Sequence, residues 1–189
     1  ALEPIALADK KADATLHLLS APTNHSLLPP NTDFTQRYNM VKWVEVGTWP
    51  LKTELMDTIL FGKRQAEQNW GEFIKIDTQG TEYEILMGSK KMLSERTVAV
   101  VTEVSFSELY RGQKLFSEVE ILLREHGFTF YGFHTIHSRS MKQLDKFSQV
   151  GAERAMYADA VFFKDPLPGT AYKGSLSIRQ QHVLFVCAL

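Results

Sequence analysis

The sequence predicts an α/β fold with a mostly parallel sheet, and two observations lead to this prediction. Two runs of apolar and β-branched residues, at 73–77 and 97–104, have the composition of strands that are covered on both faces. Amphipathic segments of helical period lie between and after these runs. Strands and helices that alternate in this way pair in parallel through right-handed crossovers.

The first part of the chain carries weaker signals. Ala6–Asp9 and Ala14–Leu19 indicate a strand end and a second strand, joined by a turn. Residues 20–38 are polar and contain prolines, so we expect them to run over the surface. Val41–Val46 alternates as a strand does, and Thr53 is the expected N-cap of a helix over 53–61.

Stronger signals begin at residue 73. Phe73–Asp77 predicts a strand, and Thr81–Glu84 predicts a capping box, in which a threonine and a glutamate satisfy free backbone N–H groups. A helix over 115–123 ends before Gly127, which suits the C′ position. We also expect strands at 97–104, 128–134 and 157–163. Ile85, Leu86, Met92 and Leu93 recur at helical spacing and should face the core. Residues 182–189 should form a late strand or a packed tail.

Length and composition limit the class of protein. The 189 residues, 44% apolar and 23% charged, suffice for one globular domain. The net charge of −1, with both signs mixed along the chain, does not indicate the basic face of a nucleic-acid-binding protein. We find no signal sequence and no run of 18 apolar residues, and therefore expect no membrane span. The single cysteine, Cys187, excludes an internal disulfide, and we expect a cytoplasmic protein.

Two carboxylates follow predicted strands, and ligands bind at the carboxyl ends of strands in an open parallel sheet. Asp77 ends the first of these strands and Glu103 the second. If the strands are neighbours, the two side chains meet on one rim, where they could share a metal ion, divide acid and base roles, or hold a polar ligand. The structural alternative is that each carboxylate only accepts backbone N–H groups from the loop that follows it.

The segment Asp77–Glu82 is the tightest group of polar residues in the chain. Gly80 allows a positive φ or a close backbone approach, and the helix that follows offers free N–H groups and a positive dipole end. Glu82 and Glu84 both have structural explanations, since a negative charge is stabilising in the first turn of a helix.

Histidines supply further candidate groups. His134 and His137 follow a predicted strand, but no further ligands at zinc spacing accompany them. We therefore expect loop packing, with one of them reaching the rim as a base. His25 lies beside Asn24 and Ser26 in a polar loop that could line a pocket.

Two common enzyme signatures are absent from the sequence. It contains no G-x-G-x-x-G dinucleotide motif and no G-x-S-x-G motif of serine hydrolases. Gly169–Ser175 resembles a phosphate loop only superficially, because no lysine directly follows the second glycine.

Several segments together resemble the FkbM family of methyltransferases. Ile74–Glu82, continued by Glu84–Gly88, is similar to the family segment Lys-Ile-Asp-x-x-Gly-x-Glu-x-x-x-Leu-x-Gly. Glu103–Phe116 is similar to the next family block. The flanking blocks are matched by Ala6–Asp9 with Ala14–Leu16, by Asn24–Leu28, and by Tyr157–Phe162, so that the resemblance covers about residues 3–164.

This resemblance implies a Rossmann-like class I methyltransferase sheet with a closing antiparallel hairpin. Residues 73–77 would be its fourth strand, 97–104 its fifth, and 128–134 with 157–163 the hairpin. The partial methyltransferase domain would span 1–164, followed by a C-terminal tail at 165–189. The reaction implied is transfer of a methyl group from S-adenosylmethionine to an oxygen of a small-molecule, sugar or lipid substrate.

The resemblance also implies roles for individual residues. The catalytic candidates are Asp77, which would lie nearest the transferred methyl group, Glu103 and His134. The candidates for contact with S-adenosylmethionine are Asp9, near the adenine edge, and Asp77, Thr78, Gln79 and Gly80. The candidates for contact with the substrate are Asn24, Ser26 and Tyr110, and no metal ligands are expected.

The sequence departs from the family pattern at its start. The first strand of the fold and its glycine-rich turn should precede Glu3, so we expect a fragment with weak or no activity. The fourth strand would then expose an unpaired edge, which invites pairing with a second copy. Two other functions compete with methyl transfer: a non-catalytic interaction module that uses this edge, and a metal-dependent enzyme built on the carboxylate rim.

Overall fold

The largest unit of the molecule is a four-stranded sheet with the strand order β4-β5-β7-β6. The computed structural model describes residues 4–63, 70–139 and 154–188. β4 (Phe73–Ile76) and β5 (Ala99–Ser105) are parallel neighbours. β7 (Arg154–Phe163) lies between β5 and β6 (Thr129–Arg139) and is antiparallel to both. These strands confirm the four that the sequence predicts, and the antiparallel pairing of β6 with β7 confirms the closing hairpin that the family resemblance implies.

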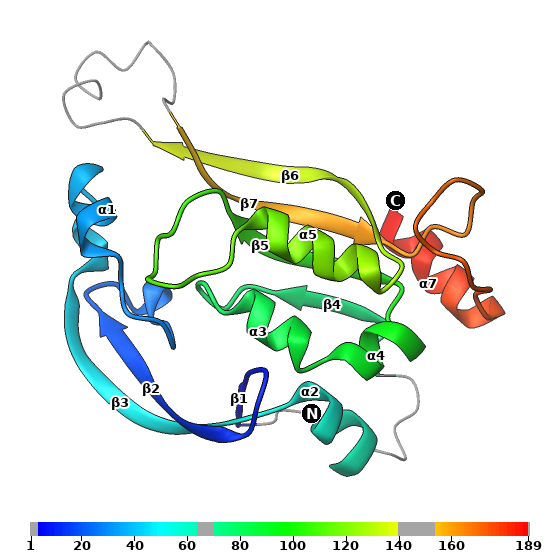
Figure 1. Ribbon diagram of the computed structural model, residues 1–189, viewed down its shortest axis with the longest axis horizontal. Helices are drawn as coiled ribbons and strands as arrows, with labels where there is room; N and C mark the ends of the chain where they lie inside the picture. Colours follow the sequence, from blue (N-terminus) through cyan, green and yellow to red (C-terminus); the bar gives the residue numbers. More distant parts are fainter. Residues whose placement is uncertain (1–3, 64–69, 140–153, 189) are drawn as a thin grey trace.

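Helices cover one face of this sheet (Figure 1). They are α3 (Glu82–Met87), α4 (Lys90–Glu95) and α5 (Phe116–Glu125). The predicted core positions lie on α3 and α4 and are buried in the core: Ile85, Leu86, Met92 and Leu93. Gly127 has φ +86 after the C-cap of α5, as its predicted C′ position requires. The mixed α/β class is thereby confirmed.

A second, smaller sheet precedes the first in the chain, with the order β1-β3-β2. Its strands are β1 (Ala6–Leu7), β2 (Ala12–Leu19) and β3 (Glu45–Glu54). Between β2 and β3 the chain forms three short helices: η1 (Pro22–Asn24), α1 (Thr32–Arg37) and η2 (Val41–Trp43). Figure 1 shows this sheet beside α3 and away from β6.

The expected strand over 41–46 and the expected helix over 53–61 are both wrong in their boundaries. Residues 41–43 are a turn of 3-10 helix, and the strand β3 runs on through Thr53. Thr53 caps no helix, because its hydroxyl donates to the carbonyls of Lys10 and Ala12 while its backbone pairs with β1 and β2. The helical segment begins later, as α2 (Met56–Thr58) and the π-helical turn η3 (Ile59–Lys63).

The end of the chain is helical and not a strand. The first turn of α7 (Ile178–Ala188) is attached to the residue before β4, because Arg179 forms a bidentate ion pair with Glu72 at 2.8 Å. Its later residues are open to solvent, since Phe185 is 64% exposed. The division into a domain at 1–164 and a tail at 165–189 stays a prediction.

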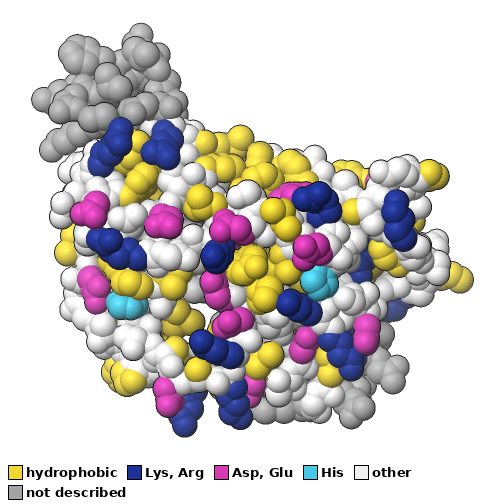
Figure 2. Space-filling view, viewed as in Figure 1, with side chains coloured by type: hydrophobic (Ala, Val, Ile, Leu, Met, Phe, Trp, Pro, Cys, Tyr) yellow, Lys and Arg dark blue, Asp and Glu magenta, His cyan; other side chains and the backbone are white. Residues whose placement is uncertain are grey.

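Charged side chains of both signs are interspersed on the face shown in Figure 2. Among the described helices, none combines the length and apolar character that crossing a bilayer requires.

Candidate functional site

The ends of β4 and β5 bring two carboxylates together. These strands pair in parallel with Ile76 opposite Thr102, so the next residues, Asp77 and Glu103, follow side by side. Because side chains alternate along a strand, both point to the sheet face that α3 and α5 leave uncovered. The predicted meeting of the two carboxylates on one rim is therefore confirmed. Asp159 lies opposite Glu103 in β7 and belongs to the same face.

Glu103 has an unusual protonation equilibrium. Burial, followed by the negative charges of Glu82, Asp77 and Asp159, raises the pKa of Glu103 to about 8. Lys75 opposes this effect only in part, because its ammonium group also pairs with Asp159 at 3.6 Å. A carboxyl group that titrates near neutral pH can both take up and release a proton under working conditions, which is what a general acid or base needs.

The loop after β4 is shaped by the buried carboxylate of Glu82. Its Oε1 accepts hydrogen bonds from the backbone N–H of Thr78 at 2.8 Å and of Gly80 at 3.1 Å. Burial raises the pKa of Glu82 even though these N–H groups favour its charged form. The predicted capping box at Thr81–Glu84 is wrong, since Thr81 makes no side-chain cap and bonds instead to the hydroxyl of Thr78. Glu82 satisfies the loop's N–H groups in its place.

Two residues of this loop have left-handed backbones. Gln79 has φ 60 and Gly80 has φ 100. A Cβ atom on Gly80 would lie 2.6 Å from the ring of Tyr110, so the position requires both the conformational freedom and the small size of glycine. Both properties expected of Gly80 are present at once.

The side chain of Gln79 links three parts of the chain. Its Nε2 donates to Oδ1 of Asp77 at 2.9 Å, and its Oε1 accepts from the hydroxyl of Tyr110 at 3.2 Å. The Ser26 hydroxyl donates to the backbone carbonyl of Gln79 at 2.6 Å. The Tyr110 hydroxyl also donates to the backbone carbonyl of Asn24 at 2.8 Å. Asn24, Ser26 and Tyr110 thus gather at the loop that carries Asp77.

A polar cavity of about 260 Å³ opens above this network. Glu103 and Gln79 contribute to its wall, as does Asn24. Ser26 and Tyr110 are each only 1% exposed, so they lie behind the wall. Direct contact between these residues and a substrate stays a prediction. The remaining lining residues are Thr23, Met40, Lys42, Trp43, Leu109, Arg139 and Tyr157.

Sequence patterns did not single out Trp43, Tyr157 or Arg139 as site residues. Tyr157 pairs with Ser105 at the end of β5, so strand register is the signal that would have found it. His137 stacks on Tyr157 at 4.5 Å. His134, the predicted catalytic histidine, is exposed on β6, and its Nδ1 lies 3.0 Å from the hydroxyl of Thr135. The structure thus places His137 against a lining residue of the cavity, and the catalytic role of His134 stays a prediction.

Asp9 lies apart from the rim. It is exposed and follows β1, and its Cα would be 3.5 Å from a Cβ on Gly88, the C-cap of α3. Thr78 and Gly80 lie at the opposite end of that helix. A cavity of about 240 Å³ lies between β1 and the loop, with Thr78 and Thr81 in its wall. The predicted contact of Asp9 with a cofactor stays a prediction.

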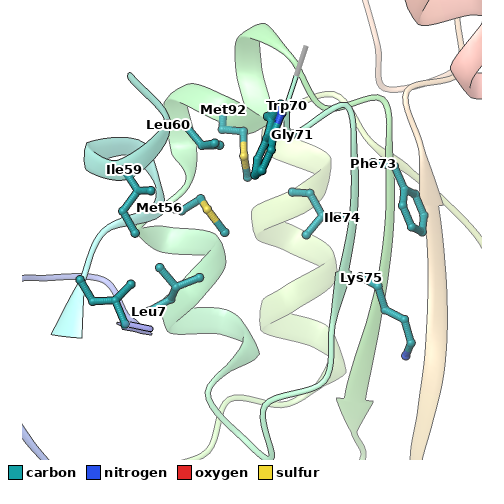
Figure 3. Close-up of a pocket in the computed structure, with 11 residues that line it drawn as sticks. Leu7, Met56, Ile59, Leu60, Trp70, Gly71, Phe73, Ile74, Lys75 and Met92 are labelled. Atoms are coloured by element: carbon teal, nitrogen blue, oxygen red, sulfur yellow. The ribbon is translucent and has the colours of Figure 1, made fainter. Parts of the chain in front are cut away.

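A third cavity, of about 310 Å³, lies at the amino end of β4 and has a different lining (Figure 3). Its walls are mostly apolar, with Met92, Leu60 and Ile74 around a common space. Among the described lining residues Lys75 is the charged one, and its side chain points away along the other side of the strand.

Within the described residues, no group of three histidine, cysteine or acidic side chains is arranged to hold a metal ion.

Comparison with known proteins gives one match. The family model of the methyltransferase FkbM domain matches residues 6–130. This range contains both sheet-end carboxylates and the whole Gln79 network. No curated protein and no solved structure matches the chain.

Proposed function

Because the chain belongs to the FkbM methyltransferase family, we propose that it serves the transfer of a methyl group from S-adenosylmethionine to a hydroxyl oxygen of a small molecule, sugar or lipid. The observation that carries the proposal is the rim at the ends of β4 and β5. There Glu103, with its pKa near 8, lies beside Asp77 and opens into a polar cavity.

The charge of the rim suits this cofactor. Asp77, Glu103 and Asp159 share one sheet face with Lys75, whose ammonium group pairs with Asp159, and Lys42 and Arg139 line the cavity beside them. S-adenosylmethionine is a sulfonium cation, which the carboxylate of Asp77 would attract. When bound, it supplies an electrophilic methyl carbon. We assign its contacts to Asp77, Thr78, Gln79 and Gly80, with Asp9 toward the adenine edge.

The acceptor hydroxyl would enter the cavity next to Glu103. A base with a pKa near the working pH removes a proton efficiently, and the half-buried Glu103 meets that condition. Asn24 in the cavity wall is the substrate contact that we propose, and His134 would assist only if β6 moves toward the rim. The strand order β4-β5-β7-β6, with β7 antiparallel, supports a class I methyltransferase sheet.

Saturation-transfer NMR with S-adenosylmethionine tests the proposal and detects weak binding. We expect signals from the cofactor with the wild-type chain that S-adenosylhomocysteine competes away. Asp77→Asn should remove most of this signal, whereas Asp13→Asn, a change at an exposed position on β2, should not. An absent wild-type signal, or equal signals from wild type and Asp77→Asn, would overturn it.

A second candidate function is an interaction module that uses the free edge of β4. Within the described residues β4 pairs only with β5, and unpaired edges bind other strands. This function would apply to self-association of the chain. Sedimentation equilibrium that shows only monomer at high protein concentration would count decisively against it.

A further inference from the structure

We propose that Gln79 is a positioning residue that holds the Asp77 carboxylate in one orientation on the rim. The proposal rests on the function proposed above, since it gives Asp77 a fixed place beside the reacting atoms. Gln79 is separated from Asp77 by one residue, and its amide is the one group among the described residues that donates a hydrogen bond to that carboxylate.

Asp77 needs such a restraint. It is exposed at the end of a strand, and a carboxylate there can rotate among several side-chain conformations of similar energy. The hydrogen bond of 2.9 Å from Gln79 to Oδ1 selects one of them. A reaction that depends on the alignment of its groups is sensitive to this choice, because small misplacements lower rates strongly.

The amide of Gln79 is itself restrained at its other end. Its Oε1 accepts a hydrogen bond from Tyr110, whose ring packs on Trp43 with centroids 4.8 Å apart. Tyr110 is 1% exposed and its backbone N–H donates to the side chain of Gln113 at 3.3 Å. Gln113 in turn donates to Ser105 in β5 at 2.8 Å. The amide is thus braced against the neighbouring strand.

The backbone of Gln79 is fixed with equal care. Its left-handed φ of 60 is uncommon for a residue other than glycine, and it aims the side chain back toward Asp77. Ser26 holds the carbonyl of Gln79, and Glu82 holds the N–H groups of the residues on both sides. These two contacts from outside the loop, made by Tyr110 and Ser26, together with Glu82, would be unnecessary if Gln79 were a solvent-exposed loop residue.

Only an amide can make both side-chain bonds. Glutamate could accept from Tyr110 but could not donate to Asp77, and it would place two carboxylates about 3 Å apart. Leucine, of similar size, would make neither bond. The two variants therefore separate loss of the donor from loss of the whole bridge.

The test has one readout that needs no ligand. In ¹H–¹⁵N spectra, the side-chain amide protons of Gln79, assigned by their absence in Gln79→Leu, should shift in Asp77→Asn and in Tyr110→Phe. They should not shift in Asp13→Asn. An amide with the shifts of free glutamine, unchanged by Asp77→Asn and Tyr110→Phe, would overturn the proposal.

The second readout is the affinity for S-adenosylmethionine by the same saturation-transfer method. Gln79→Glu and Gln79→Leu should weaken binding about tenfold, as is expected of Asp77→Asn, and thermal melting should show that the variants remain folded. The matched control, Gln36→Leu at an exposed position of α1, should bind like wild type. Unchanged affinity in folded Gln79→Leu would overturn the positioning role. If wild type binds no cofactor while the amide shifts occur, the proposed methyltransferase function fails and the bridge to Asp77 stands.

Discussion

The two ends of strand β4 differ sharply in chemistry, although each lies beside a cavity of similar volume. At the amino end the cavity of about 310 Å³ is walled by side chains such as Met92 and Leu60. Near the carboxyl end the cavity of about 260 Å³ is walled by Glu103, Gln79 and Arg139. The comparison teaches that one short strand has mainly apolar side chains around its start and gathers polar and ionisable side chains at its end. The loops that leave parallel strands collect at the carboxyl end alone, so polar groups from distant parts of the chain meet there.

The sharpest test of the polar end is Gly80→Ala. The new Cβ would meet the Tyr110 ring at 2.6 Å on a backbone with φ 100, and we expect a loss of about 4 kcal/mol in the free energy of unfolding. Gly112→Ala is the matched control, because its φ is +79 but nothing lies within 4 Å of the added atom. Urea denaturation should give a loss of about 1 kcal/mol there. Equal losses in the two variants would mean that Tyr110 does not pack on the loop.

At the apolar end, Met92→Ala should cost about 3 kcal/mol. Met92 is 1% exposed in the main core, and its removal leaves a void beside the existing cavity. Ile121→Ala on α5, where the side chain is 46% exposed, should cost less than about 1 kcal/mol in the same urea titration. Cofactor affinity should be unchanged in Met92→Ala, since Met92 belongs to the apolar core and lines the cavity at the amino end of β4. A loss of affinity in folded protein would contradict the division between the two ends.

Glu82 and Glu84 lie on the same helix, α3, but differ in whether their buried carboxylate oxygens have hydrogen-bond partners. The carboxylate of Glu82 accepts backbone N–H bonds at both of its oxygens, whereas the amide in Glu82→Gln has only one acceptor oxygen. We therefore expect Glu82→Gln to lower the free energy of unfolding by about 2 kcal/mol. Glu84 has an Oε2 that is buried without a partner, and burial raises its pKa. Glu84→Gln should therefore leave stability within about 0.5 kcal/mol of wild type or raise it. Thermal melts at pH 7 distinguish the two, and the reverse ranking would refute the loop-shaping role of Glu82.

The smallest expected effect concerns the pH dependence from Glu103. Its folded-state pKa of about 8 lies above the value of 4.5 for the unfolded chain, so the folded state keeps a proton that the unfolded chain releases between these pH values. Stability conferred by that proton is present below pH 4.5 and is lost as the pH rises to 8. Relative to Glu103→Gln, wild type should lose about 1–2 kcal/mol between pH 5 and 9, since solvent screens this half-buried group. If the free energies of unfolding of the two proteins changed with pH in parallel, the pKa of Glu103 would not be raised in the folded state.

Much of the main sheet could be predicted, because its signals are local. Val98–Val101 is continuously apolar, and the helices α3 to α5 place their apolar residues at helical spacing. From these, the parallel pairing of β4 with β5 and the meeting of Asp77 with Glu103 follow directly. The family resemblance added the closing hairpin, which the strand order confirms.

The rest depends on contacts between residues distant in sequence. Thr53 has the chemistry of an N-cap, yet pairing with β1 and β2 holds it in a strand. Thr81 and Glu84 have the spacing of a capping box, but in the structure the carboxylate of Glu82 accepts the backbone N–H groups of the loop instead. In the bridge from Tyr110 through Gln79 to Asp77, Tyr110 lies 31 positions after Gln79, and no local pattern encodes their contact.

The position of β7 between β5 and β6 constrains the order in which this chain can assemble. β6 is synthesised before β7 but has no place in the sheet until β7 has paired with β5. The last two strands must therefore dock together as a hairpin or wait for each other, which makes closure of the sheet a long-range and comparatively slow event. During synthesis on the ribosome, the long edge of β5 stays open to wrong partners until Phe163 has emerged.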